Sequence, residues 1–360
     1  MSRKLLALAV SALTLGLGAG PAMADIPLSG QLAEQVAGSQ QSAQSNANST
    51  QINPNNTNIS VRVLSPGDDG DVTQSNQSGA GSFAGNSNDT TQTVDQSQGG
   101  AGGVGVQESG QLAGNQQWAD SNAESTQVNP QNRNINVRVL SEGDNGSVDQ
   151  SNESKAKSFA GNKNTLSQDL TQDQSGSACC PHPGNSRDSE HSDKKDPCGC
   201  QSGVGIQAGG QEAYNKQNAK SNAESKQIKP TNQNISVRVL SPGDDGDVSQ
   251  TNSSTALSGA FNKNDTSQSI DQSQAGSGRC GCADGIGIQA GGQKAFNWQH
   301  ADSNAESKQI HPTNKALSLR FKSPSEGHGG TLSQANSSFA GSLAANKNVL
   351  SQTLTQSQGS

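Results

Sequence analysis

The feature that most constrains the fold is a module that the chain repeats four times. Equivalent segments open at Gln35, Gln111, Gln211 and Gln293, which are 76, 100 and 82 residues apart. The two longer intervals contain insertions, and without them the period is close to 76 residues. A repeated unit of this kind cannot bury a face alone, so the modules are expected to stack on one another.

The repeat predicts a division of the chain into seven segments. A leader covers residues 1–24, and insertions cover residues 179–202 and 280–284. The four modules are expected at residues 25–100, 101–178, 203–279 and 285–360. The last module ends on the repeat itself, so no polar cap is expected at that end of the stack.

The first 24 residues have the pattern of a secretory signal peptide. Arg3 and Lys4 precede an apolar run from Leu5 to Leu17, and a small-residue cleavage site ends at Ala24. No second apolar run follows, so no membrane span is expected in the mature chain. The predicted location is therefore extracellular or at the cell surface.

The composition limits what can hold the modules together. Only 28% of the residues are hydrophobic and 2% are aromatic, while Ser, Asn, Gln and Gly dominate. Such a chain is either disordered or held by ordered stacks of backbone and amide hydrogen bonds. The net charge of −7 argues against a nucleic-acid partner.

The middle of each module has the alternation of a β-strand. In NISVRVL, Ile235, Val237 and Val239 alternate with other residues, and turn formers flank the run on both sides. Near-verbatim recurrence of this spacing argues against disorder. We therefore predict an all-β chain: a repetitive β-solenoid of stacked short strands, with small residues and amides in its interior. The Cys/His-rich insertion is expected to form a loop.

Two parts of each module resemble the curlin-type amyloid repeat, in which Gln and Asn recur at fixed spacing. The third part reads N-x-N-x3-Q-x3-Q, as from Asn86 to Gln96. The first part supplies Q-x-G, as at Gln207–Gly209, and N-A-x3-Q at Asn46–Gln51, Asn122–Gln127, Asn222–Gln227 and Asn304–Gln309. The resemblance implies secreted subunits of adhesion or biofilm fibres, with these amides pointing inward in ladders. The implied self-association ladder consists of Gln92, Gln96, Gln168, Gln172, Gln268, Gln272, Gln352, Gln356, Asn88, Asn164, Asn264 and Asn348.

Acidic turns follow the alternating run. Closely spaced carboxylates in a turn that contains glycine can bind calcium, although a solvated turn whose charges protect a sheet edge is the favoured interpretation. The spacing matches no known calcium loop. The candidate ligands are Asp68, Asp69, Asp71, Asp244, Asp245 and Asp247.

All cysteines lie in the two insertions. An even number in a secreted chain favours disulfides. The alternative is a zinc site, since His182 and His191 share the larger insertion, but the C-C and C-x-C spacings are weak zinc signatures. The disulfide candidates are Cys179, Cys180, Cys198, Cys200, Cys280 and Cys282.

No nucleophile motif, phosphate loop or paired acid is found, so neither enzymatic activity nor a cofactor is expected. The leading hypothesis is a secreted structural protein that self-associates into surface or matrix fibres. Its expected partners are further copies of itself, with other surface-fibre subunits as additional candidates. The alternative is a monomeric extracellular adhesin or a calcium- or metal-binding surface module.

Overall fold

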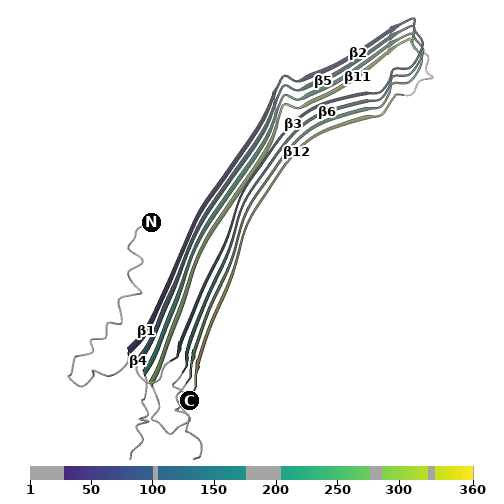
Figure 1. Ribbon diagram of the computed structural model, residues 1–360. Helices are drawn as coiled ribbons and strands as arrows, with labels where there is room; N and C mark the ends of the chain where they lie inside the picture. The colour runs from purple at the N-terminus through teal and green to yellow at the C-terminus, as the bar shows by residue number, and fades with distance from the viewer. Residues whose placement is uncertain (1–27, 100–103, 176–203, 276–285, 323–328, 360) are drawn as a thin grey trace, which may run out of the picture.

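Each module forms one layer of a stack, which we call a rung. The computed structural model describes residues 28–99, 104–175, 204–275, 286–322 and 329–359. Every rung contains a long strand, a short strand and a second long strand (Figure 1). The first two rungs comprise β1 (Leu28–Ile52), β2 (Asn55–Val63), β3 (Val72–Gly99), β4 (Val104–Val128), β5 (Gln131–Val139) and β6 (Val148–Ser175). The last two comprise β7 (Val204–Ile228), β8 (Thr231–Val239), β9 (Val248–Gln274), β10 (Ile286–Ile310), β11 (Thr313–Phe321) and β12 (Leu332–Gln358).

The rungs stack into three parallel four-stranded sheets. Sheet A has the order β1-β4-β7-β10, sheet B the order β2-β5-β8-β11, and sheet C the order β3-β6-β9-β12. The pairing is in register, so that Gln35 lies beside Gln111, and Gln111 beside Gln211. Each residue therefore has its own counterpart in the neighbouring rungs, which explains why the modules keep the same spacing.

Within a rung the chain makes one long hairpin. It leaves the base along sheet A, continues along sheet B to the tip, and returns along sheet C to the base (Figure 1). We call sheets A and C the shaft, and sheet B with the turn that follows it the tip. The prediction of short strands is wrong for the shaft, where single strands run for 25 to 28 residues. The polar alternation continues without a proline or a turn, so nothing ends these strands earlier.

The bend between shaft and tip occurs where a residue with positive φ precedes a proline. Asn53, Asn129, Lys229 and His311 have φ between 50° and 53°. A second column with positive φ follows sheet B at Leu64, Leu140, Leu240 and Lys322. L-residues adopt this backbone at some cost. Its recurrence in all four rungs follows from the in-register stacking, which makes successive rungs follow the same path.

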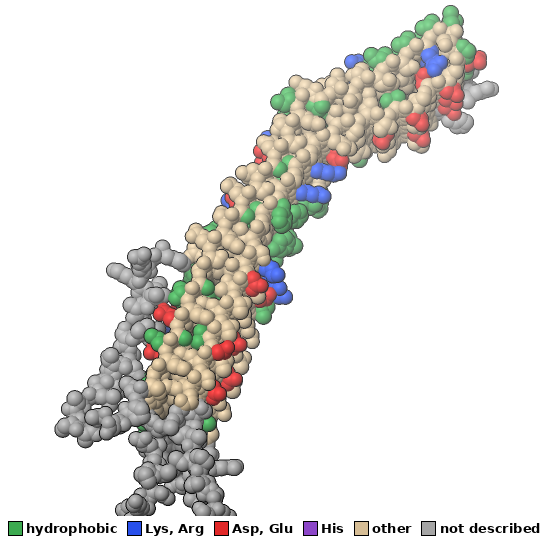
Figure 2. Space-filling view, in the orientation of Figure 1, with side chains coloured by type: hydrophobic (Ala, Val, Ile, Leu, Met, Phe, Trp, Pro, Cys, Tyr) green, Lys and Arg blue, Asp and Glu red, His purple; other side chains and the backbone are tan. Residues whose placement is uncertain are grey.

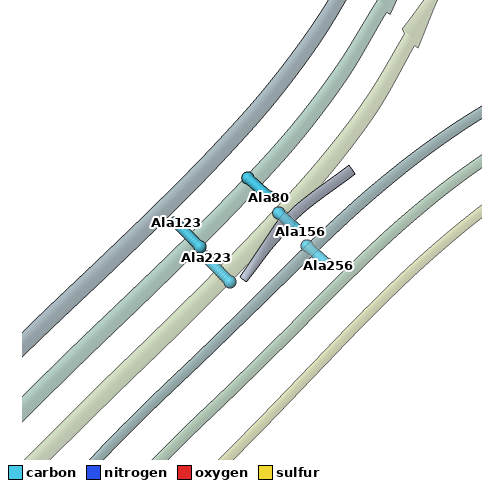
Figure 3. Close-up of a cluster of buried hydrophobic side chains, with 5 residues drawn as sticks. All are labelled: Ala80, Ala123, Ala156, Ala223 and Ala256. Carbon is cyan, nitrogen blue, oxygen red and sulfur yellow. The ribbon is translucent and has the colours of Figure 1, made fainter. Parts of the chain in front are cut away.

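The interior between sheets A and C is filled by small and amide side chains. Ala80, Ala156 and Ala256 of sheet C meet Ala123 and Ala223 of sheet A (Figure 3). A second alanine cluster lies nearby, and larger apolar residues such as Leu170 and Ile270 form a buried cluster nearer the base. Small side chains allow the two sheets to approach closely, so little apolar surface is needed.

The alternating run in sheet B points its β-branched residues outward. Ile59 and Val61 are each 61% exposed. Their neighbours on the opposite face point inward, and among them Arg138 and Arg238 are 0% exposed. The predicted leader (1–24) and both predicted insertions (179–202 and 280–284) lie outside the described residues.

Candidate self-association surface

The Gln residues identified in the sequence form two continuous hydrogen-bond ladders inside sheet C. Gln168 Nε2 donates to Gln92 Oε1 at 2.7 Å, and Gln268 Nε2 donates to Gln168 Oε1 at 2.8 Å. The ladder ends with Gln352, which donates to Gln268 at 2.5 Å. The second ladder joins Gln96, Gln172, Gln272 and Gln356 at 2.7 to 2.8 Å. In both ladders the later rung donates to the earlier one.

The Asn ladders inside the stack run in the opposite direction. Asn88 Nδ2 donates to Asn164 Oδ1 at 2.9 Å, and the ladder continues through Asn264 to Asn348 at 2.8 Å. The ladder that starts at Asn76 runs the same way through three further rungs. Here the earlier rung donates to the later one. Side-chain amides of both types give and accept bonds along the stacking axis, so no charge accumulates.

The structure also contains ladders that the sequence reasoning did not single out. In sheet A, Gln117 donates to Gln41 and Gln217 donates to Gln117, both at 2.8 Å. Buried serines and alanines separate these amides. The signal that could have identified them is the recurrence of Gln at the same place in every module.

One matched amide of the resemblance points outward. Asn122 and Asn222 belong to the N-A-x3-Q pattern, yet they lie on the outer face of sheet A, where Asn222 donates to Asn122 at 2.9 Å. The Gln that ends the same pattern faces inward, as at Gln127 and Gln227. The expectation that both amides of this pattern point inward is therefore wrong. The two amides are five positions apart, and an odd number of positions places two residues on opposite faces of a strand.

Sheet C is offset along the stacking axis, so that its amides also reach the following rung of sheets A and B. Gln92 Nε2 donates to the carbonyl of Leu112, one rung ahead, at 3.1 Å. Gln268 does the same to Lys294 at 3.2 Å. In the other direction, Gln31 and Gln35 of sheet A donate to sheet C carbonyls of their own rung. Each strand of sheet C that has a rung after it is therefore hydrogen-bonded to sheet A both in its own rung and in the next rung.

The two ends of the described stack are consequently different and complementary. At the fourth rung, the ladder directions leave Gln oxygens and Asn nitrogens pointing onward. At the first rung, they leave Gln nitrogens and Asn oxygens pointing outward. β1 and β10 are also the two edges of sheet A, with backbone groups directed away from the stack. At the ladder positions that all four rungs share, the fourth rung therefore presents an acceptor where the first rung presents a donor, and the reverse.

The tip contains an arginine column that the sequence reasoning missed. Arg62, Arg138, Arg238 and Arg320 stack in register on the inner face of sheet B. Asp69 lies 2.7 Å from Arg62 Nε and 3.0 Å from Arg138 Nη2. Asp245 lies 2.9 Å from Arg238 Nε and 3.1 Å from Arg320 Nε. Each of these carboxylates joins the arginines of two adjacent rungs.

The equivalent position in the second rung is the neutral Asn145. Its Oδ1 accepts from Arg138 Nε at 2.9 Å, and its Nδ2 donates to Asp245 Oδ1 at 3.1 Å. Backbone carbonyls complete the bonding, since Arg138 donates to Gly67 and Arg238 donates to Gly143. Closely spaced arginines are thus held by shared carboxylates and turn carbonyls.

The pKa values of the two carboxylates follow from these contacts. Burial raises the pKa of Asp69, but hydrogen bonds from Arg62 and Ser60 and the charge of Arg138 outweigh it, so the pKa lies below its ordinary value. Burial also raises the pKa of Asp245, and the opposing bonds from Ser318, Arg238 and Ser236 lower it in total. Both groups are therefore ionised at neutral pH.

Three of the four remaining calcium candidates accept backbone hydrogen bonds from the next rung. Asp68 Oδ1 accepts from the N–H of Asp144 at 2.8 Å, and Asp71 Oδ1 accepts from the N–H of Ser147 at 2.8 Å. Asp247 Oδ1 accepts from the backbone and hydroxyl of Thr331, and these bonds lower its pKa. Asp244 donates its own N–H to Asp144 Oδ1 at 2.7 Å. The acidic turns thus connect successive rungs.

Within the described ranges, no three His, Cys, Asp or Glu residues come together as metal ligands. All six cysteines lie outside those ranges, so the disulfide and zinc interpretations stay predictions. The part of the chain that the structure describes has no helix long and apolar enough to cross a membrane. Comparison with models of protein families, with curated proteins and with solved structures found no match.

Proposed function

We propose that this chain is a secreted structural protein whose copies stack end to end into fibres, as the resemblance to curlin-type repeats implies. The observation that carries the proposal is the complementarity of the two ends. A second copy placed on the fourth rung in the same orientation would continue the Gln ladders that end at Gln352 and Gln356 and the Asn ladders that end at Asn336 and Asn348. Two fourth rungs facing each other would oppose acceptor to acceptor, so the contact is head to tail and open.

The charges support the same arrangement. Acidic residues occupy alternate rungs in several columns. Asp89 and Asp265 lie beside Thr165 and Val349, and Asp71 and Asp247 lie beside Ser147 and Thr331. The fourth rung is neutral at these positions, so a following first rung would place its aspartates two rungs from the last ones. At about 4.8 Å per rung, like charges stay roughly 10 Å apart.

The test substitutes the leading edge of β12. Gln352→Lys with Gln356→Lys would put unpaired ammonium groups into the joined interior, which is costly. Ser351→Lys with Thr353→Lys is the matched control, because it adds the same charge to the same strand on its outer face. We expect the inward pair to slow fibre growth at least tenfold and the outward pair to change it less than threefold.

Growth is followed by thioflavin fluorescence at equal monomer concentration, with electron microscopy of the products. Equal rates of fibre growth for the two variants would show that the fourth rung is not the surface that recruits the next copy. Soluble monomers of the unsubstituted chain at all concentrations, with a β-rich circular dichroism spectrum, would instead favour the monomeric adhesin. Outward-facing amides and exposed aromatic residues would then be the surfaces to study.

A further inference from the structure

Three columns on the outer face of sheet B are apolar in every rung. They are Ile59, Ile135, Ile235 and Leu317; Val61, Val137, Val237 and Leu319; Val63, Val139, Val239 and Phe321. We call this surface the Ile–Val face. No charged residue lies within these columns, because Arg62, Arg138, Arg238 and Arg320 point inward and Arg133 and Lys315 lie in the column beside Ile59. Figure 2 shows hydrophobic side chains gathered at this end of the molecule.

The outer faces of the shaft sheets are different. Along sheet C they carry Ser, Thr, Lys and Asp around a less regular aromatic group, in which Phe83 lies beside Phe159, and Phe159 and Phe261 both lie close to Gly259. A chain that is only 28% hydrophobic thus places its most regular apolar array on the outside. Side chains repeated at the spacing of the rungs form a flat surface, and such surfaces pair with identical surfaces as dry zippers.

We infer that the Ile–Val face joins two stacks side by side, with the face of one stack against the face of another. This inference rests on the proposed end-to-end assembly. In a two-fold arrangement about the fibre axis, facing strands run antiparallel. Val61 then opposes Val61, and Ile59 opposes Val63. The basic residues Arg133 and Lys315, in the column next to Ile59, fall at the margin.

The area of the face explains why a stack is needed. Four rungs at about 4.8 Å and three alternate residues at about 6.6 Å give a footprint of about 400 Å² per chain. Two chains would bury about 800 Å² together, which is less than the roughly 1,000 Å² that a specific interface needs. Two or three stacked copies on each side exceed that value, so pairing follows end-to-end growth and does not precede it.

The connections between rungs cannot cover the face. The strand ends joined by residues 100–103, 176–203 and 276–285 all lie at the base (Figure 1). Sheet B begins 25 residues along each strand of sheet A, or about 80 Å from the base. The longest connection is tied at both ends, so it extends at most about 50 Å. A second copy of the chain carries the same flat apolar columns and is the occupant that we infer.

The experiment measures mass per length of fibres by dark-field electron microscopy. Val61→Lys with Val237→Lys places charges on the Ile–Val face in alternate rungs. This is the same spacing that Asp89 and Asp265 have in sheet C. The matched control, Thr91→Lys with Ser267→Lys, does the same on the outer face of sheet C. We expect two chains per about 19 Å for the unsubstituted protein and for the control. The Val61 and Val237 variant should show one chain, a halving of mass per length.

A second pair, Val61→Thr with Val237→Thr, keeps the shape of the side chains and adds two hydroxyl groups. It should at least double the fraction of single-file fibres, even if the lysine variant forms none. Single-file fibres from the unsubstituted chain would overturn the pairing and leave the end-to-end proposal standing. Fully paired fibres from the threonine variant would also overturn the pairing. Absence of fibres from the unsubstituted chain would overturn both.

Discussion

In the shaft, the interior contains neutral amides, serines and alanines, whereas the interior of the tip contains four arginines and two paired aspartates. Both regions stack the same residue on itself in every rung. An amide ladder accepts any number of rungs, because each side chain gives one bond and receives one. An arginine column does not, because like charges about 4.8 Å apart need counterions.

The shaft therefore repeats every rung and the tip repeats every two. Asp69 joins the first and second rungs, and Asp245 joins the third and fourth. Between the second and third rungs only the neutral Asn145 lies in the column. In the shaft, the same amide hydrogen bonds join every pair of neighbouring rungs. In the tip, ionised carboxylates join the first rung to the second and the third to the fourth.

Acid should break the tip and leave the shaft intact, and this is the largest effect we expect. The pKa values of Asp69 and Asp245 are lowered in the folded chain. Their contribution is therefore complete above the ordinary value of 3.8 and is lost as the pH falls below it through the lowered values. Hydrogen exchange, corrected for intrinsic pH dependence, should show faster exchange in β8 below pH 4 and little change in the middle of β7. Uniform acceleration of both would contradict the distinction.

Removal of one carboxylate should have a smaller effect in the same region. Asp245→Asn leaves the buried Arg238 without its counterion and removes a carboxylate contact from Arg320, which costs about 4 kcal/mol. The control is Asp271→Asn, which removes the same charge from an exposed outer position of the same rung and should cost less than about 0.5 kcal/mol. Urea unfolding followed by circular dichroism compares them. Similar midpoints for both variants would show that the ion pairs contribute little.

Interruption of one ladder tests the shaft. Gln172→Leu leaves Gln96 Oε1 without its donor and Gln272 Nε2 without one of its two acceptors, at a cost of about 3 kcal/mol. Thr171→Leu, on the outer face of the same strand, is the control. The loss should be the same at low and high salt, unlike that of Asp245→Asn. A salt-dependent loss would mean that charge also matters in the shaft.

The turn glycine at position 243 should tolerate substitution less well than a shaft glycine. Gly243 has φ 116°, and a Cβ there would lie 2.3 Å from the carbonyl oxygen of Gly143 in the rung below. Gly243→Ala should therefore cost about 2 kcal/mol. Gly210→Ala meets open space on the outer face of sheet A and serves as the control. Equal urea midpoints would show that the tip rungs can separate freely.

The smallest expected effect is a gain. Lys229 adopts φ 52° at the bend between shaft and tip, is exposed, and is followed by a proline. Lys229→Gly removes the strain of that conformation and should stabilise the chain by about 1 kcal/mol. Lys226→Gly, in the regular strand three residues earlier, should destabilise it by a similar amount. Thermal unfolding shows whether each substitution raises or lowers the stability of the chain. A loss of stability in both variants would contradict the proposed strain at Lys229.

Much of the fold could be predicted from the sequence, because in-register stacking makes the repeat directly visible. The period, the β-structure and the recurrent amides at Gln92 and Gln168 follow from spacing alone. The lengths of the strands could not be predicted, because polar alternation without turn residues does not show where a strand ends and the chain folds back. Arg238 was also missed as an interior residue. Its partner Asp245 follows a turn, and only the folded hairpin brings the two together.

The strand ends on either side of every connection between rungs lie at the base (Figure 1), which has a consequence for display. In a fibre of stacked copies, the strand ends Ser175 and Val204, which residues 176–203 join, would recur at the same margin about every 19 Å along the axis. Any weak contact that this segment makes with a surface would then be multiplied along the fibre. The effective concentration of neighbouring segments would rise, and attachment would strengthen with fibre length rather than with the affinity of a single contact.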